Sequence, residues 1–221
     1  MSTLRRHIKR VAPGLAAFVG QLRALPTLRS RTIFIRRVLA RRLLSKLDRF
    51  PERLGNPALV IFVCRGNIMR SALAEAIVRA RLKEGTTVSV TSAGINAKPG
   101  TGADPRAAAY ARTLGLSLAD HRAQAFDYAL VSRADLIVAL DHGIEAEILA
   151  RAPSGHDRVV LLGGVDLGGV YRGTDIPDPY AADEPEATRL FKAVERDALQ
   201  LATWLQARRP AAATEGGESG R

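Results

Sequence analysis

An unbroken run of five apolar residues, Leu59 to Val63, ends directly at a cysteine, Cys64. Its length and its branched and aromatic side chains favour a strand that is buried on both faces, as in a parallel sheet. After a short loop, apolar residues from Ala72 onward recur at the spacing of an amphipathic helix. A strand, a tight loop and a helix in this order aim the loop's backbone N–H groups and the positive end of the helix dipole at one point. The sequence therefore predicts an anion site at Cys64–Ser71.

Two side chains of this loop have the chemistry that phosphoryl transfer needs. A helix N-terminus and nearby arginines stabilise a negative sulfur, so we expect Cys64 to be largely thiolate at neutral pH. Arg70 lies six residues further along the chain, and its planar set of donors can bind two oxygens of a phosphoryl group. The alternative roles for this pair are an inert structural cysteine and a surface ion-pair arginine.

Strand and helix patterns alternate along the rest of the chain. The segments predicted as strands are residues 59–63, 87–91, 136–140 and 158–162. The segments with helical spacing and suitable ends are residues 72–84, 104–114, 142–150 and 184–208. This alternation is typical of an α/β fold, here a doubly wound four-stranded parallel sheet with helices on both faces. The site of such a fold lies at the carboxyl ends of the strands, where Cys64 is expected.

Charge divides the chain into a basic N-terminal part and a nearly neutral remainder. Residues 1–55 contain 14 Lys or Arg and 2 Asp or Glu, whereas residues 56–221 contain 19 and 20. The whole-chain pI of 10.7 therefore reflects residues 1–55, which we predict to be a basic helical extension ending in a linker. Residues 56–208 are the predicted α/β domain, and residues 209–221 are a tail that we expect to be disordered.

The basic extension has two interpretations. Residues 32–50 can form a helix with leucines on one side and basic residues largely on the other: Leu39, Leu43 and Leu47 against Arg37, Arg41, Arg42 and Lys46. One interpretation is a solvated or partly disordered helix that packs loosely on the domain. The other is a surface that binds an anionic membrane or a partner protein.

Location and partners are constrained by what the sequence lacks. The weakly apolar stretch Val11 to Leu22 is too short to span a bilayer and makes a poor signal peptide. The single cysteine excludes a disulfide within one chain, and a thiolate that must stay reduced favours the cytoplasm, peripheral to the membrane if the extension binds there. No specific nucleic acid partner is expected, because the domain itself has no basic excess.

The pattern Cys-x5-Arg-Ser at Cys64–Ser71 resembles the phosphate-binding loop of the low molecular weight protein tyrosine phosphatases. The segment Ile176–Tyr180, with the sequence IPDPY, stands where that family has an Asp-Pro loop carrying its general acid. Three further segments resemble family segments in the family's order: residues 91–94, 120–123 and 134–141. The resemblance covers residues 56–208 and identifies them as a low molecular weight phosphatase domain.

The resemblance implies a protein tyrosine phosphatase that uses a phosphocysteine intermediate and neither metal nor cofactor. Cys64 would be the nucleophile, Arg70 would bind the phosphoryl oxygens, and Asp178 would protonate the leaving phenolate and then activate water. The residues implied in substrate binding are Arg65, Gly66, Asn67, Ile68, Met69, Ser71 and Tyr180. Ser92 and His121 would support the loop. Ser71 could donate to the thiolate or cap the helix, and Asp141 could frame the site or cap the helix that follows it.

Substrate class remains to be distinguished. Relatives that resemble protein arginine phosphatases have Thr at the position of Ile68, which favours phosphotyrosine here. The implied partner is a phosphotyrosine protein, for bacterial relatives often a tyrosine kinase of polysaccharide export. The alternatives are an arsenate reductase, which would need an external thiol because Cys64 is the only cysteine, a non-catalytic phosphate-binding scaffold module, and a phosphatase of small molecules.

Overall fold

A four-stranded parallel sheet forms the centre of the computed structural model, which describes residues 17–44, 55–163 and 173–207. Its strands are β1 (Leu59–Cys64), β2 (Ser89–Gly94), β3 (Leu136–Ala139) and β4 (Val159–Leu161). Their spatial order is β2-β1-β3-β4, and every neighbouring pair is parallel. The predicted fold class is confirmed, and β1 lies inside the sheet with its carboxyl end at Cys64.

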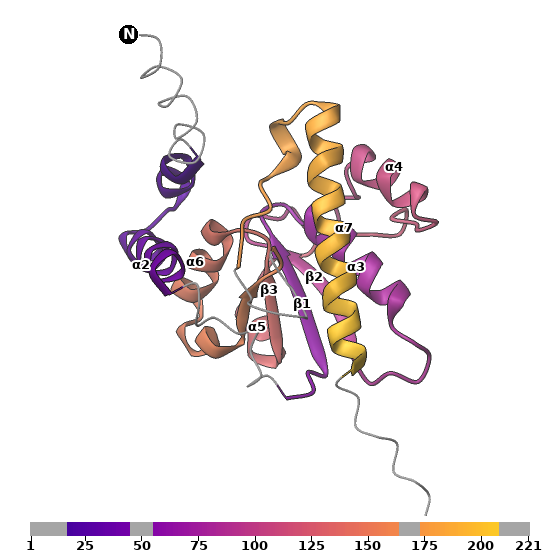
Figure 1. The fold of residues 1–221 in the computed structure, drawn as a ribbon, viewed down its shortest axis with the longest axis horizontal. Helices are drawn as coiled ribbons and strands as arrows, with labels where there is room; N and C mark the ends of the chain where they lie inside the picture. The colour runs from indigo at the N-terminus through magenta and orange to yellow at the C-terminus, as the bar shows by residue number, and fades with distance from the viewer. Residues whose placement is uncertain (1–16, 45–54, 164–172, 208–221) are drawn as a thin grey trace, which may run out of the picture.

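Helices cover both faces of the sheet (Figure 1). One layer contains α3 (Arg70–Arg81), α4 (Pro105–Thr113) and the long α7 (Glu184–Ala207). The other layer contains α5 (Tyr128–Arg133) and α6 (His142–Arg151). The chain also forms two short 3₁₀ helices, η1 (Pro153–Arg158) and η2 (Pro179–Ala181). The apolar stripe along α7 is buried: Leu190, Val194, Ala198, Leu201 and Leu205. Neither α5 nor the helix over residues 17–24 was predicted, because such short segments contain too few residues to establish a helical period.

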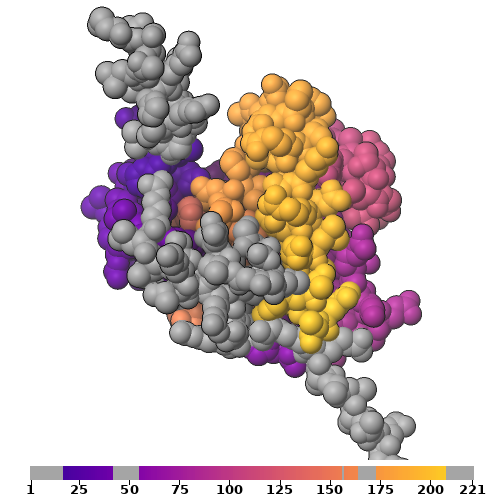
Figure 2. All heavy atoms as spheres, viewed as in Figure 1, coloured from indigo at the N-terminus to yellow at the C-terminus, as the bar shows by residue number. Residues whose placement is uncertain are grey.

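The N-terminal part packs against the domain more closely than the sequence suggests. Residues 17–24 form a helix, and α2 (Leu28–Leu44) follows and lies beside α6. In Figure 2 these helices, in indigo, occupy the side of the molecule away from α3 and α4. Phe34 and Val38 are buried in a small cluster that includes Ala146 of α6. The interpretation of a loosely packed, solvated helix is therefore wrong.

The orientation of α2 also corrects the predicted faces. Leu39, expected on the apolar side, is 50% exposed. Arg37 and Arg41, expected on the polar side, pair with the buried Glu145 of α6. Ion pairs between α2 and α6 therefore turn toward the domain the basic side of α2, which hydropathy alone assigns to solvent. The predicted continuation of this helix over residues 45–50 and the tail at 209–221 lie outside the described residues.

No helix in the described ranges has both the length and the apolar character needed to cross a bilayer.

Candidate active site

The loop Cys64–Ser71, hereafter the phosphate loop, joins the carboxyl end of β1 to the start of α3. Cys64 is the last residue of β1, and Arg70 is the first residue of α3. Met69 occupies the N-cap position and makes no side-chain capping bond. The N–H groups of the first turn of α3 are therefore not occupied by a capping side chain, which suits an anion bound at this end of the helix.

The Cys64 sulfur lies among polar groups although it is buried. The backbone N–H of Asn67 donates a hydrogen bond to Sγ at 3.2 Å. The Ser71 hydroxyl lies 3.0 Å from Sγ, and it is not at the helix cap, so the capping role considered for it does not apply. Two donors near the sulfur stabilise a negative charge on it.

Arg70 is buried and is held on three sides. Its Nη1 donates to Asp141 Oδ2 at 2.8 Å and to the Ile176 carbonyl at 2.9 Å, and its Nη2 lies 2.8 Å from Asp178 Oδ2. Burial alone would lower the pKa of Arg70, but the charges of Asp141, Asp178 and Cys64 raise it above its ordinary value. Among the described residues, the buried Nε–H has no hydrogen-bond partner. The guanidinium is thus a permanent cation whose buried Nε–H is not used by the protein.

Asn67 keeps the phosphate loop in its shape. Its φ of 54° is the only left-handed φ of a non-glycine residue in the described chain, and Asn tolerates this conformation better than most residues. Its side-chain Nδ2 donates to Ser71 Oγ at 2.9 Å and to Ser92 Oγ at 2.7 Å. Its Oδ1 accepts from the Gln124 N–H at 2.8 Å. One side chain therefore ties the loop to α3, β2 and the segment after residue 120.

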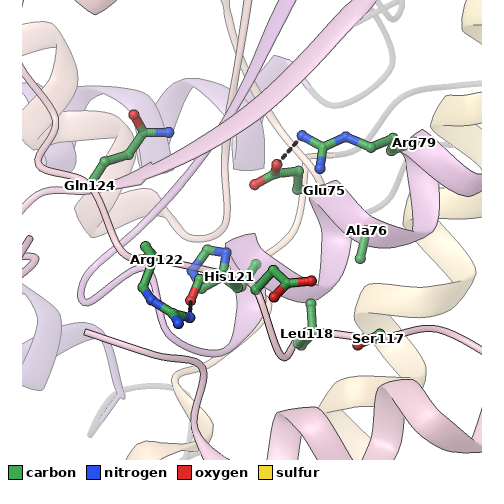
Figure 3. A pocket seen from close by; sticks show the side chains of 10 residues that line it. Glu75, Ala76, Arg79, Ser117, Leu118, His121, Arg122 and Gln124 are labelled. Carbon is green, nitrogen blue, oxygen red and sulfur yellow. Dashed lines mark hydrogen bonds and ion pairs between the residues drawn. The ribbon is translucent and has the colours of Figure 1, made fainter. Parts of the chain in front are cut away.

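A second set of residues supports the phosphate loop from behind. His121 Nε2 lies 2.6 Å from the Asn67 carbonyl oxygen, and Ser92 Oγ donates to Glu75 Oε2 at 2.5 Å. Glu75 in turn pairs with Arg79 one helical turn along α3. Figure 3 shows Glu75, Arg79 and His121 around a separate pocket of 310 Å³ on this side. The predicted supporting residues Ser92 and His121 lie next to Asn67, in the places where they could act on the loop.

The front of the phosphate loop opens into a pocket of 220 Å³. Its lining contains eight of the residues selected from the sequence: Cys64, Arg65, Gly66, Ile68, Met69, Arg70, Asp178 and Tyr180. Asp178 precedes η2 and accepts the Tyr180 N–H through Oδ1 at 3.3 Å, while Tyr180 is 67% exposed at the rim. Residues more than 100 positions apart in the sequence thus form one site, with a thiol at its base, a cation beside it and a carboxyl group at its mouth.

Three contributors were not assigned a role, or not their full role, from the sequence. Asp141 does both things considered for it: Oδ1 accepts the Ile144 N–H and caps α6, and Oδ2 holds Arg70. Glu75 was given no role from the sequence, and it is buried and accepts a hydrogen bond from Ser92. At Gly94, a β-carbon would approach Arg65 O and Asn67 N to 2.8 Å, so only glycine lets β2 pass this close to the loop. The available sequence signal for Gly94 was its place in the segment 91–94, which resembles a family segment.

Comparisons with known proteins agree with this arrangement. A family model described as low molecular weight phosphotyrosine protein phosphatase matches residues 59–211. A low molecular weight protein-tyrosine-phosphatase of Streptomyces coelicolor is 42% identical over 127 residues, which are 55% of this chain and 77% of that protein. The low molecular weight protein-tyrosine phosphatase A of Mycobacterium tuberculosis is 35% identical over 159 residues, which are 70% of this chain and 96% of the relative.

Solved structures with the same fold include two kinds of phosphatase. The tyrosine phosphatase Wzb from Escherichia coli K30, in complex with sulphate, has a TM-score of 0.60 and 26% identity, covering 67% of this chain and 99% of its own. The YwlE arginine phosphatase from Geobacillus stearothermophilus has a TM-score of 0.61 and 28% identity, covering 67% and 93%. The family model begins at residue 59 and so leaves the N-terminal part outside.

Proposed function

This chain belongs to the low molecular weight phosphotyrosine protein phosphatase family, and we propose that it hydrolyses phosphotyrosine in proteins through a phosphocysteine on Cys64. The observation that carries the proposal is the buried Arg70 Nε–H without a hydrogen-bond partner, on a side chain that lines the same pocket as Cys64 and Asp178. A phosphoryl oxygen would satisfy this donor. A scaffold module that only bound phosphate would need neither a nucleophile nor a carboxyl group at the mouth of the site.

Binding would place the phosphoryl group between the phosphate loop and Arg70. The backbone N–H groups of the loop and the helix dipole of α3 attract its charge. Arg70 would donate to two oxygens, and Asp178 would then give up its present ion pair with Arg70 Nη2 and turn to the leaving oxygen. Asp141 would stay paired with Nη1 and keep the guanidinium in place. Because phosphoryl transfer requires little beyond positioning and charge stabilisation, these contacts account for most of the rate enhancement.

The reaction has two steps. In the first, the Cys64 thiolate forms an S–P bond while the P–O bond to the phenol breaks, and protonated Asp178 gives its proton to the leaving phenolate. In the second, water attacks the phosphorus, Asp178 takes a proton from it, and the S–P bond breaks to release inorganic phosphate. Ser71 and the Asn67 N–H stabilise the sulfur anion that leaves in this second step.

The pocket favours an aromatic substrate over a guanidinium. Ile68 contributes a purely apolar side chain to the lining, and Tyr180 at the rim can stack on a phenyl ring. A phosphorylated guanidinium has several N–H groups, which Ile68 cannot satisfy. The structural likeness to YwlE arginine phosphatases nevertheless makes phosphoarginine the competing substrate to test.

One substrate panel separates the candidate activities. Purified protein would be assayed with p-nitrophenyl phosphate, a phosphotyrosine peptide, a phosphoarginine peptide and arsenate with external thiol, with Cys64→Ser as the control. We expect phosphate release from the first two, weak release from phosphoarginine, and none from Cys64→Ser. Preference for phosphoarginine, or turnover only with arsenate, would reject the proposed substrate.

We further propose a cytoplasmic location and a phosphotyrosine protein substrate such as a bacterial tyrosine kinase.

The protein would meet an anionic membrane surface through the outer side of α2. Leu28 and Leu39 are 80% and 50% exposed there, and Arg29 and Arg36 on the same helix are exposed. Apolar side chains beside arginines are the pattern of helices that lie on anionic bilayers.

A further inference from the structure

The N-terminal helices meet the catalytic domain at the first turn of α6. Glu145 is fully buried there, and its Oε1 and Oε2 accept hydrogen bonds from Arg41 Nη2 and Nη1 at 2.8 and 2.6 Å. Arg37 Nη2 adds a third contact at 2.5 Å. We call residues 17–44 the arm. Because two arginines of α2 converge on one buried carboxylate, the arm is held at a defined position against α6.

The same turn of α6 connects the arm to the segment that carries Asp178. Arg41 Nη1 lies 3.0 Å from His142 Nδ1, and the His142 N–H donates to Asp175 Oδ1 at 2.7 Å. The other Asp175 oxygen, Oδ2, accepts from Gln21 Nε2 at 2.6 Å. Asp175 is therefore held between the domain and the arm, three residues before Asp178.

A second contact lies two residues earlier. At Gly173, which has a φ of 50°, a β-carbon would come within 2.8 Å of Arg41 Nε. The backbone of the acid loop, defined as residues 173–178, thus lies directly against the guanidinium that holds α2 to α6. The next anchor is made by the domain alone, because the Ile176 N–H donates to the Leu140 carbonyl at 3.0 Å and its own carbonyl accepts from Arg70.

From these contacts we propose that the arm positions the general acid. Gln21 and Arg41 anchor the start of the acid loop, Ile176 anchors its middle, and Asp178 at its end must move from Arg70 to the leaving oxygen during the reaction. The domain also holds the start of the loop, because the Thr174 N–H donates to the Gly163 carbonyl at 2.7 Å and the His142 backbone N–H donates to Asp175 Oδ1 at 2.7 Å. Releasing the contacts with Gln21 and Arg41 removes the arm's part of this anchor and widens the range of positions that Asp178 adopts. Gln21 is then a positioning residue for a reaction whose other groups all lie beyond residue 63.

The inference rests on the proposed function, since it concerns the step in which Asp178 donates a proton. It predicts a loss that depends on the leaving group. A basic phenolate needs the proton in the transition state, whereas an activated phenolate leaves without it. A variant that only lowered the folded fraction would reduce the rates for all substrates by one factor.

The test compares Gln21→Met, which keeps volume but removes the donor, and Gln21→Glu, which sets a like charge against Asp175. Arg23→Met, at an exposed position on the same helix as Gln21, is the matched control, and Asp178→Asn defines complete loss of the acid. For each full-length protein, kcat/KM is measured over a series of aryl phosphates. Hydrogen exchange of the peptide containing residues 173–178 is followed in parallel.

We expect kcat/KM for the poorest leaving group to fall about fivefold in Gln21→Met and more in Gln21→Glu, because small displacements of a catalytic group have large kinetic effects. The value of kcat/KM for the best leaving group should change less than about twofold. Hydrogen exchange over residues 173–178 should accelerate in the two Gln21 variants and not in the matched control. Equal losses across the series, or unchanged exchange, would overturn the proposal. If wild-type protein hydrolysed no aryl phosphate, the proposed function would fail, and the exchange comparison would still decide whether the arm anchors the loop.

Discussion

Asn67 is the residue at which backbone geometry and catalysis are most tightly linked. It adopts a left-handed φ, donates its backbone N–H to the Cys64 sulfur, and bonds through its side chain to Ser71, Ser92 and the Gln124 backbone. The backbone conformation aims the N–H at the sulfur, and the side chain keeps the conformation. Two substitutions can separate these contributions.

Asn67→Gly and Asn67→Ala both remove the side-chain bonds, but only glycine tolerates the positive φ without strain. Both variants should lose kcat/KM for p-nitrophenyl phosphate by on the order of 100-fold, because the loop N–H groups lose their alignment. Asn67→Ala should also unfold with about 1 kcal/mol less stability than Asn67→Gly, the cost of a left-handed residue with a β-carbon. Urea denaturation of the two proteins checks the difference. Equal stability would mean that the loop relaxes out of the left-handed conformation.

The main catalytic candidates could be identified from sequence because they lie in one short motif and one Asp-Pro segment. Asn67, Ser92 and His121 followed from the family resemblance. Glu75 did not, because its function depends on Ser92 reaching it from β2 at 2.5 Å, and such a pairing between separate elements leaves no local pattern. The same reason applies to the Ile176 carbonyl, which accepts from Arg70, whereas Asp141, which also accepts from Arg70, was considered from the sequence as a residue that frames the site.

At the scale of elements, β1, β3 and β4 were predicted well because buried parallel strands are continuous apolar runs. The strand predicted over residues 87–91 lies at Ser89–Gly94 instead, because its small and polar residues do not mark its ends. The helix α2 was predicted with the wrong face inward. Its arginines were placed in solvent on hydropathy, yet Arg37 and Arg41 pair with Glu145, which follows them by more than 100 residues in the chain. Hydropathy periodicity cannot detect a buried ion pair between distant elements.

The ion pairs of Glu145 with Arg37 and Arg41 make the packing of α2 on α6 dependent on pH. Burial alone would raise the pKa of Glu145, but hydrogen bonds from Arg41 and His142 and the charges of Arg41 and Arg37 lower it well below its ordinary value of 4.5. A carboxylate whose pKa is lower in the folded than in the unfolded state stabilises the folded protein at pH values above its unfolded pKa. This stabilisation decreases as the pH falls below the unfolded pKa toward the folded one. Hydrogen-exchange protection of α2 should therefore be complete at pH 7 and should decrease progressively below about pH 4.5.

Glu145→Gln should remove this protection at neutral pH, because breaking a buried pair from one side costs on the order of 3 kcal/mol. Glu186→Gln is the matched control, since Glu186 pairs with Arg189 on the exposed side of α7. Peptide-level hydrogen exchange at pH 7 compares the two. Full protection of α2 in Glu145→Gln would show that apolar contacts around Phe34 hold the arm alone.

At the scale of the whole molecule, the docked arm leaves a basic outer surface on α2 for an anionic membrane. Arg29→Gln and Arg36→Gln should each weaken binding to phosphatidylserine-containing vesicles about fivefold, because each basic residue near such a surface contributes about 1 kcal/mol. Arg112→Gln, an exposed arginine on α4, is the control. Vesicle co-sedimentation at two salt concentrations measures the effect. Binding that is equally strong in all three variants would place the contact elsewhere on the protein.

The central claim is that phosphate passes through the Cys64 sulfur, and a single-turnover trap tests it most directly. Protein in excess over a phosphotyrosine peptide is mixed rapidly and denatured at increasing times, and the peptide containing Cys64 is analysed by mass spectrometry. We predict that phosphate appears on Cys64 before inorganic phosphate is released, that Asp178→Asn prolongs the phosphorylated state because the attacking water loses its base, and that Cys64→Ala gives neither signal. Phosphate release by Cys64→Ala, or release by wild-type protein with no phosphorylated Cys64 at any time, would contradict the account.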